Sequence, residues 1–282
     1  MPAEVRGVWW RLVISVLLAV IGLVAVSVFA LLGVFVAARL MGYPDFTLDV
    51  TDGINVGELL GTNIGLALLM PVAIGLAWWL YDVRPRWLSS VKPGVRWGWL
   101  GLCLAMTLAV FGLLLVAGTV GAVIERDTPL DKAALAFLLV VLLTTPLQVA
   151  GEEYLFRGLL LQAFGATRLP ELACCLATGL LFGAVHLQFD PPLLADRVLL
   201  GAVFAWLTIR TGGLEAAIAV HLVNNLAVLI PAGLLGDVDA QLDPTDITWL
   251  PLGVHLVLLG ILVPWILFVW RRHGGAQPPG SA

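Results

Sequence analysis

The stretch "ALAFLLVVLLTTPLQVAGEEYLFRGLLLQAFG", residues 134–165, decides what kind of fold this chain can form. Apart from a short charged interruption it is apolar, and it is longer than the roughly 18 apolar residues that indicate a transmembrane helix. A β-strand is excluded, because an open sheet cannot satisfy its backbone hydrogen bonds in lipid and no alternating barrel pattern is present. The stretch therefore predicts a membrane-spanning helix with charged residues inside it.

The rest of the chain has the same apolar character. Of its 282 residues, 60% are hydrophobic and only 12% are charged, whereas soluble domains carry roughly 25% charged residues. We therefore predict an all-α fold, a polytopic membrane helical bundle of about eight transmembrane helices. The predicted spans are residues 8–40, 58–81, 97–123, 132–164, 169–187, 193–211, 214–235 and 248–270.

The charges in the loops predict the orientation of the bundle. Basic residues precede the first span and follow every second span, whereas the intervening loops are acidic. Positively charged loops favour the cytoplasm, so both termini are expected there. The Ala-, Gly-, Leu- and Val-rich composition indicates a bacterial protein, and hence a multi-pass protein of the bacterial cytoplasmic membrane. The basic positions are Arg6, Arg11, Arg84, Arg86, Lys92, Arg96, Arg168, Arg210, Arg271 and Arg272.

The polar residues inside the spans divide the chain into three parts. Residues 1–131 hold the first three helices, residues 132–232 a core of helices four to seven, and residues 233–282 the last helix and a short cytoplasmic tail. An ionisable group inside a span costs about 2.5–3.5 kcal/mol even on insertion scales, so the core is where a function is expected. The candidate site residues in this core are Gln148, Glu152, Glu153, Arg157, His186, His221, Asn224 and Asn225.

Helical spacing groups these residues further. Glu153 and Arg157 are four residues apart with the acid first, which is the better orientation for an ion pair. Glu152 points about 100° away from that face, so it is left without an evident partner. His221 and Asn225 also share one face. Each feature alone has an ordinary structural explanation, such as a helix-end ion pair or interhelical amides, but together they favour a functional site.

Three motifs resemble those of one family of intramembrane proteases. "EEYLFRG" matches the Glu-Glu-x-x-x-Arg motif of the CPBP family, also called the Abi or CAAX-protease family. "FGAVH" (Phe182–His186) matches its Phe-x-x-x-His motif, and "HLVNN" (His221–Asn225) matches its His-x-x-x-Asn motif. The resemblance covers about residues 132–232. The eight-helix layout is also similar to that of the type II CAAX prenyl endopeptidases.

The resemblance implies an endopeptidase that hydrolyses peptide bonds with an activated water molecule. In this interpretation Glu152 is the general base and His186 holds and activates the water. His221 and Asn225 stabilise the oxyanion, for which a preorganised donor is typically worth about 2.7–4 kcal/mol. Glu153 positions the site or shares in water activation.

The resemblance gives Arg157 and Phe182 structural roles and leaves metal dependence open. Glu152, His186 and His221 form a ligand set like that of catalytic zinc sites. A metal-free mechanism uses the same residues, and no His-Glu-x-x-His motif is present to favour zinc. The cofactor is therefore either a divalent metal such as zinc or none.

The implied partners are the lipid bilayer and a membrane-tethered peptide or protein. This substrate would be lipidated near its C-terminus in the CAAX manner or, in a bacterium, would be a secreted peptide. No feature indicates nucleic acid. Two alternatives remain open, a non-catalytic peptide-binding or bacteriocin-immunity protein and a transporter. Transporters often contain repeats that would place polar residues in both halves of the chain. The substrate, its cleavage site and the oligomeric state are not predicted.

The depth of the motifs in the membrane raises one structural question. If all spans are complete, Glu152 lies toward the cytoplasmic end of its helix and His186 near the outer end of the next. The two side chains can then meet only if the helices are offset, tilted or broken. Pro146 and Gly151 are the expected kink positions in the longer helix.

Overall fold

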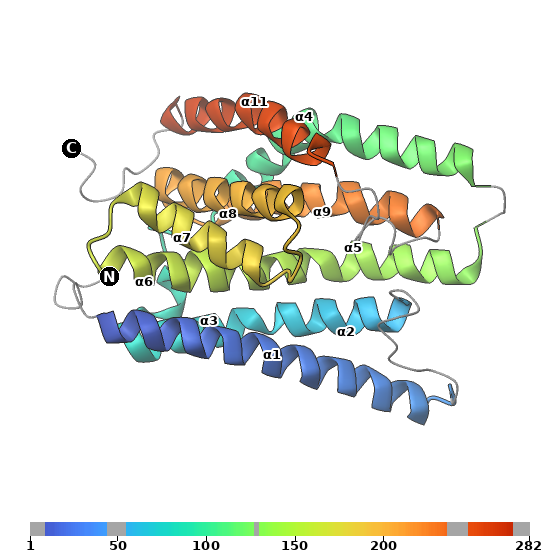
Figure 1. Ribbon diagram of the computed structural model, residues 1–282, viewed down its shortest axis with the longest axis horizontal. Helices are drawn as coiled ribbons and strands as arrows, with labels where there is room; N and C mark the ends of the chain where they lie inside the picture. Colours follow the sequence, from blue (N-terminus) through green and yellow to red (C-terminus); the bar gives the residue numbers. More distant parts are fainter. Residues whose placement is uncertain (1–8, 44–54, 127–129, 236–247, 273–282) are drawn as a thin grey trace.

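The computed structural model describes residues 9–43, 55–126, 130–235 and 248–272 of the protein. Within these ranges the regular elements are helical, and extended backbone pairs only in an isolated bridge between Ser90 and Gly213. The predicted all-α fold is confirmed. The elements, shown in Figure 1, are α1 (Trp9–Leu40), α2 (Val56–Ala67), α3 (Leu69–Tyr81), η2 (Pro85–Trp87), α4 (Trp97–Glu125), α5 (Lys132–Glu153), η3 (Tyr154–Leu160), α6 (Leu161–Ala166), α7 (Glu171–Ala184), α8 (Pro191–Thr211), α9 (Glu215–Leu235) and α11 (Leu250–Arg272).

Seven helical runs among the described residues are long and apolar enough to cross a membrane, which makes the chain an integral multi-pass membrane protein. The predicted span 169–187 is the exception, because it forms only the 14-residue helix α7. At about 1.5 Å per residue, α7 is about 21 Å long, which is shorter than the roughly 30 Å hydrocarbon core. The chain turns after Ala184, and three residues later Leu187 has a left-handed backbone conformation with φ 57°, so the helix does not continue.

The short helix α7 and its neighbour α8 form a hairpin. In Figure 1 the turn between them lies near the middle of the bundle's length, whereas α4, α5 and α9 continue to the far end. The start of α7 and the end of α8 therefore lie at the same end of the bundle. As a result, α1 begins and α11 ends at the same end of the bundle (Figure 1).

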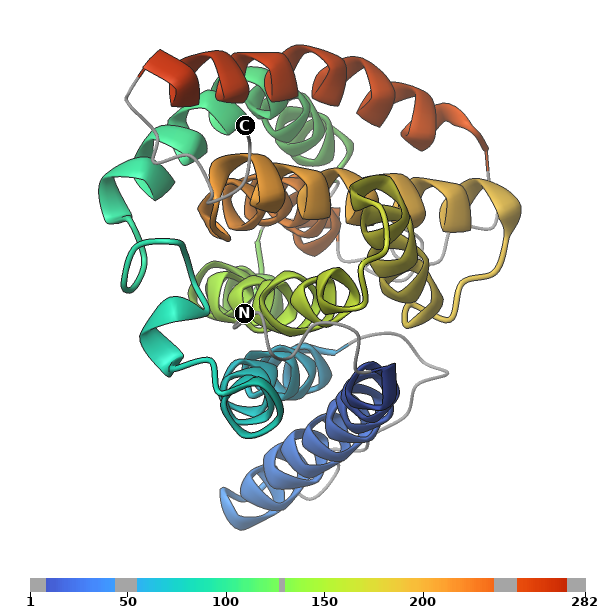
Figure 2. The same cartoon turned by 90° about the vertical axis from the view of Figure 1, so that its left-hand side faces the viewer.

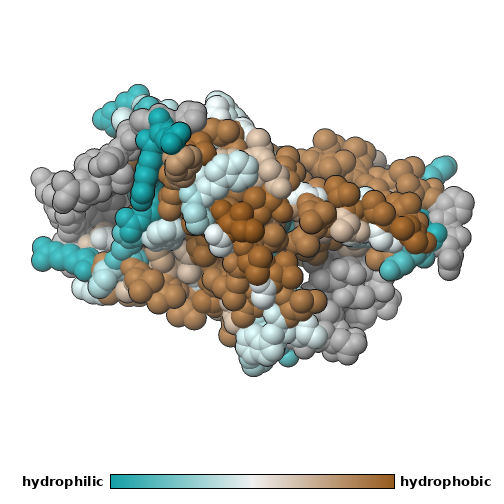
Figure 3. All heavy atoms as spheres, turned by 90° about the horizontal axis from the view of Figure 1, so that it is seen from above, coloured by the Kyte–Doolittle hydropathy of each residue, from teal (hydrophilic) through white to brown (hydrophobic). Residues whose placement is uncertain are grey.

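The helices are arranged in layers around the run from α5 to α6. Figure 2, which looks along the bundle, shows α1 at one edge, then α2 and α3, then α5 to α6, then α8 and α9, with α11 at the opposite edge. The face seen in Figure 3 is apolar over its middle, with hydrophilic residues toward its ends. This distribution is the one that a membrane-embedded surface requires.

The long central helix is not broken at Pro146 or Gly151. It changes instead to π-helical hydrogen bonding at η3, directly after Glu153, and such π segments occur frequently at functional sites. Gly151 has another role, since a Cβ atom there would overlap the Leu66 carbonyl group. Glycine is needed because the backbones of α5 and α2 approach each other closely at this point.

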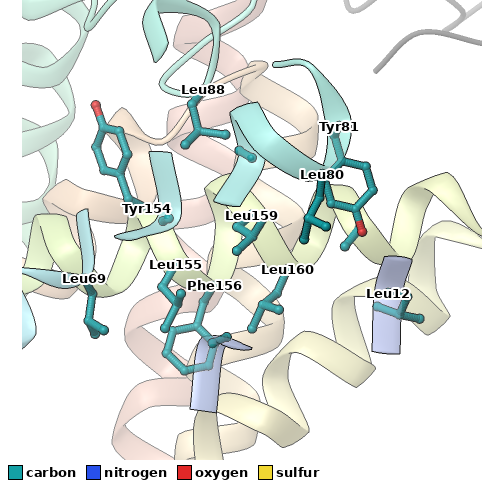
Figure 4. Packing of buried hydrophobic residues seen from close by; sticks show 14 of the residues in the cluster. Leu12, Leu69, Leu80, Tyr81, Leu88, Tyr154, Leu155, Phe156, Leu159 and Leu160 are labelled. Atoms are coloured by element: carbon teal, nitrogen blue, oxygen red, sulfur yellow. The ribbon is translucent and has the colours of Figure 1, made fainter. Parts of the chain in front are cut away.

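Buried apolar side chains fix η3 against the first layers of the bundle. The side chains of Leu155 and Leu159 are almost fully buried, and Figure 4 shows them in the cluster formed with residues of α1, α3 and the segment after α3. The residues labelled there are Leu12, Leu69, Leu80, Tyr81, Leu88, Tyr154, Leu155, Phe156, Leu159 and Leu160. The widened turn after the two glutamates is therefore held by core packing on the side of α1 and α3.

Candidate active site

The three motifs place their polar residues on three helices that meet in the interior of the bundle. Glu152 and Glu153 are the last residues of α5, His186 follows the end of α7, and His221 and Asn225 lie on α9. The hairpin geometry answers the question of depth. The turn that follows α7 lies near the middle of the bundle's length rather than at its far end (Figure 1), and His186 is in that turn.

Glu153 is the most enclosed of these groups, with no exposed surface. Its Oε1 atom accepts hydrogen bonds from Arg157 Nη1 and from His221 Nδ1, both at 2.8 Å. The ion pair expected from the four-residue spacing is therefore present. A bond from α9 to the same carboxylate oxygen was not expected, and it holds His221 against α5.

Glu152 has a different environment from its neighbour. It is buried, with 8% of its surface exposed, and its Oε2 atom has no hydrogen-bond partner among the described residues. His221 Nε2 lies 3.5 Å from that oxygen, so His221 lies between the two glutamates. Buried polar atoms are nearly always hydrogen-bonded to protein or water, so this oxygen is an open acceptor. Glu153 Oε2 also has no partner among the described residues, but the Glu153 carboxylate is already bonded to Arg157 and His221 through Oε1.

Aromatic rings pack against the charged groups. The Arg157 guanidinium is fully buried, and its Nη2 atom donates to the Gly201 carbonyl at 3.1 Å. It lies over the Phe182 ring at 4.6 Å and the Phe204 ring at 5.2 Å. The Phe204 ring in turn stacks on His221 with ring centroids 5.3 Å apart. The pair partner of Glu153 is therefore shielded from water by aromatic rings.

Phe182 links the two histidines. Its ring centroid lies 4.8 Å from that of His186 and 5.6 Å from that of His221. His186 Nδ1 donates to the Phe182 carbonyl at 2.7 Å, which leaves Nε2 as the nitrogen available to a ligand.

Asn225 is part of a contact between α9 and α5. Its Nδ2 atom donates to Gln148 Oε1 at 3.2 Å. The neighbouring Asn224 points to a different helix, where it meets His255 on α11. The sequence prediction did not include His255 or its partner Asp196. The signal was present, because both are ionisable residues inside apolar segments.

The proposed metal ligands do not form a metal centre in the described part of the chain. No three His, Cys, Asp or Glu side chains there are grouped closely enough to hold a metal ion. The Nδ1 atoms of His221 and His186 bond to Glu153 and to a carbonyl group, which leaves the Nε2 atoms as the nitrogens that could bind a metal. The misfit to a zinc site lies in the spacing, because the three side chains are not close enough together to share one ion.

Comparison with known proteins agrees with the motif-based resemblance. Residues 132–227, which contain all three motifs, match the family described as Type II CAAX prenyl endopeptidase Rce1-like. The fold and this match together define a multi-pass membrane protein with an Rce1-like region. The match supports a function of the CAAX-type intramembrane protease kind in general.

A curated bacterial protein is similar over a longer part of the chain. The protein is 24% identical over 241 residues to the uncharacterized protein YyaK of Bacillus subtilis (strain 168). The aligned region covers 80% of this chain and 78% of that relative. No solved structure matches the chain.

Proposed function

We propose that the protein is an intramembrane endopeptidase that hydrolyses peptide bonds of membrane-tethered peptides or proteins. The observation that carries this proposal is the Glu152 carboxylate, buried and without a hydrogen bond on Oε2. It lies beside His221, in a region that matches an endopeptidase family. A buried acceptor next to an imidazole group is suited to taking a proton from water.

The proposed reaction uses only groups of this chain. Glu152 accepts a proton from a water molecule that His186 orients through Nε2, and the resulting hydroxide attacks the peptide carbonyl carbon. His221 and Asn225 stabilise the oxyanion as hydrogen-bond donors, His221 when both of its ring nitrogens carry protons. Glu152 then delivers its proton to the leaving amine nitrogen. Glu153 keeps His221 in place throughout, because it accepts the hydrogen bond from Nδ1.

The position of the candidate site within the bundle supports the proposed substrate class. A site within the bundle is reached by a peptide that is held at the bilayer, as a lipidated CAAX-like C-terminus or a membrane-bound secreted peptide would be. The direct test is incubation of the purified protein in detergent and in liposomes with a lipidated and an unlipidated peptide library. Mass spectrometry should find new termini, with faster cleavage of the lipidated set. Binding without any product would instead favour a peptide-binding or immunity protein.

Replacement of Asn225 by alanine should weaken turnover without abolishing it. The loss of one oxyanion donor typically lowers kcat about 10²–10³-fold, while the water and its general base remain. Because Asn225 also donates to Gln148, the thermal unfolding of the variant should be measured beside its single-turnover rate. A wild-type rate in Asn225→Ala would remove this residue from the proposed oxyanion site.

The orientation of the bundle in the bacterial cytoplasmic membrane is a further part of the proposal. The described basic residues between α3 and α4 lie at the end where α1 begins and α11 ends (Figure 1). Positive loops favour the cytoplasm. A reporter fused after Lys92 should therefore be cytoplasmic, and one fused after Asp239, which lies outside the described residues, should be on the opposite side. The same side for both fusions would contradict this topology.

A further inference from the structure

A second, partly buried polar cluster lies next to the candidate site, on the other side of α9. His255 Nδ1 donates to Asp196 Oδ1 at 2.7 Å, and His255 Nε2 lies 2.8 Å from the amide oxygen of Asn224. Asp196 is only 2% exposed, and the His255 ring stacks on Phe111 with centroids 6.2 Å apart. Three helices, α8, α9 and α11, are therefore joined by one imidazole.

The cluster continues to the turn that carries His186. Arg197 follows Asp196 on α8, and its Nη1 atom lies 3.9 Å from Asp196 Oδ2. Its Nη2 atom donates to Gln188 Oε1 at 3.3 Å. Gln188 is two residues after His186, in the turn where Leu187 holds a left-handed backbone. A non-glycine residue in that conformation persists only when its surroundings hold it.

The same cluster fixes the rotation of α9. Asn224 bonds to His255 on α11, whereas Asn225 bonds to Gln148 on α5. Consecutive helical residues point about 100° apart, so the two amides hold α9 from two directions at one level. His221 lies one turn earlier on the same helix, and its direction toward the glutamates depends on that rotation.

We propose that Asp196, Arg197 and His255 are positioning residues for the candidate active site. The chain of contacts from Gln188 to Asn224 sets the turn that bears His186 relative to the helix that bears His221 and Asn225. The proposal rests on the proposed function and adds residues outside its reacting groups. His255 lies on the last helix, beyond the segment 132–227 that matches the family.

Two conservative replacements of His255 separate a positioning role from general stability. An asparagine side chain places its amide near Nδ1 and keeps the contact with Asp196, whereas glutamine reaches the Nε2 position and keeps the contact with Asn224. We expect His255→Ala to lower kcat about 10- to 100-fold with an unchanged KM, because small displacements of catalytic groups have effects of this size. Each replacement keeps one link of the chain and breaks the other, so His255→Gln and His255→Asn should each restore only part of the lost kcat.

The control is Ser15→Ala, which removes the buried Ser15–Tyr81 hydrogen bond of 2.9 Å between α1 and α3. It should lower the Tm and leave kcat unchanged. This result would show that losing a buried hydrogen bond is not by itself sufficient to lower kcat. Wild-type kcat in His255→Ala would overturn the proposal. Full rescue of kcat by either replacement would also overturn it, because the chain of contacts from Gln188 to Asn224 would then not have to be intact.

A second measurement does not depend on activity. Gln188→Ala and Asn224→Ala remove the two ends of the chain of contacts, and groups in one network show non-additive effects. The double variant should therefore lose less Tm than the sum of the two single losses. If the wild-type protein cleaves no peptide, the proposed function fails while this cycle still tests the network. Additive Tm losses would show that the turn and α9 are not coupled.

Discussion

Glu152→Gln is expected to abolish peptide cleavage while the protein stays folded. The amide keeps the shape of the side chain but cannot accept the proton of the attacking water, and loss of a general base typically costs about 10²–10⁴-fold. Folding should be unaffected or improved, because Glu152 Oε2 has no hydrogen bond to lose and a buried charge is removed. Single-turnover cleavage and Tm should be measured on the same preparation.

A matched control for Glu152→Gln is the same replacement at Glu171. That residue lies in the first turn of α7, and 37% of its side chain is exposed in a pair with Arg210. Glu171→Gln should cleave at the wild-type rate. Cleavage by Glu152→Gln at that rate would disprove the mechanism. Altered solute flux with no peptide product from the wild type would instead identify a transporter.

Arg157→Ala should destabilise the protein more than any of the replacements at Glu152, Asn225 or His255. Arg157 and Glu153 are both fully buried, and removing one partner of such a pair typically costs about 3–5 kcal/mol. The Gly201 carbonyl also loses its donor, and a space opens between the Phe182 and Phe204 rings. We expect little folded protein after extraction, measured by size-exclusion chromatography and thermal unfolding.

The exposed pair between Arg210 and Glu171 gives the comparison for Arg157→Ala. Its charged atoms are 2.7 Å apart, close to the 2.8 Å of the buried pair, but 47% of the Arg210 side chain is exposed. Exposed ion pairs contribute about 0–1 kcal/mol, so Arg210→Ala should be nearly neutral. Similar stability losses in the two variants would mean that burial does not set the strength of the Glu153–Arg157 pair.

The family resemblance and the structure bring the same candidate residues together but contribute different details. The motifs predicted which residues belong together, and the match over residues 132–227 is consistent with that grouping. The motifs did not predict that His221 forms a hydrogen bond with Glu153. They also left out His255, because it lies on the last helix, after the last motif. The catalytic roles stay predictions, which the Glu152 and Asn225 variants test.

The sequence by itself determined the fold class and the local part of the site. A membrane-embedded chain must satisfy all its backbone hydrogen bonds internally, and this one lacks the alternating pattern of a barrel, so helices follow from its apolar composition and that missing pattern. The Glu153–Arg157 pair follows from a spacing of four residues on one helix. Both results depend only on residues that are near one another in the chain.

Only the tertiary structure decided how the helices meet. It showed that α7 ends at Ala184 and forms a hairpin with α8, that His221 bonds across 68 residues to Glu153, and that Asn224 bonds across 31 residues to His255. Helical periodicity specifies which face a residue occupies, but not which helix lies opposite that face or at what depth. Those choices depend on packing between distant segments, such as the contact of Gly151 with the Leu66 backbone.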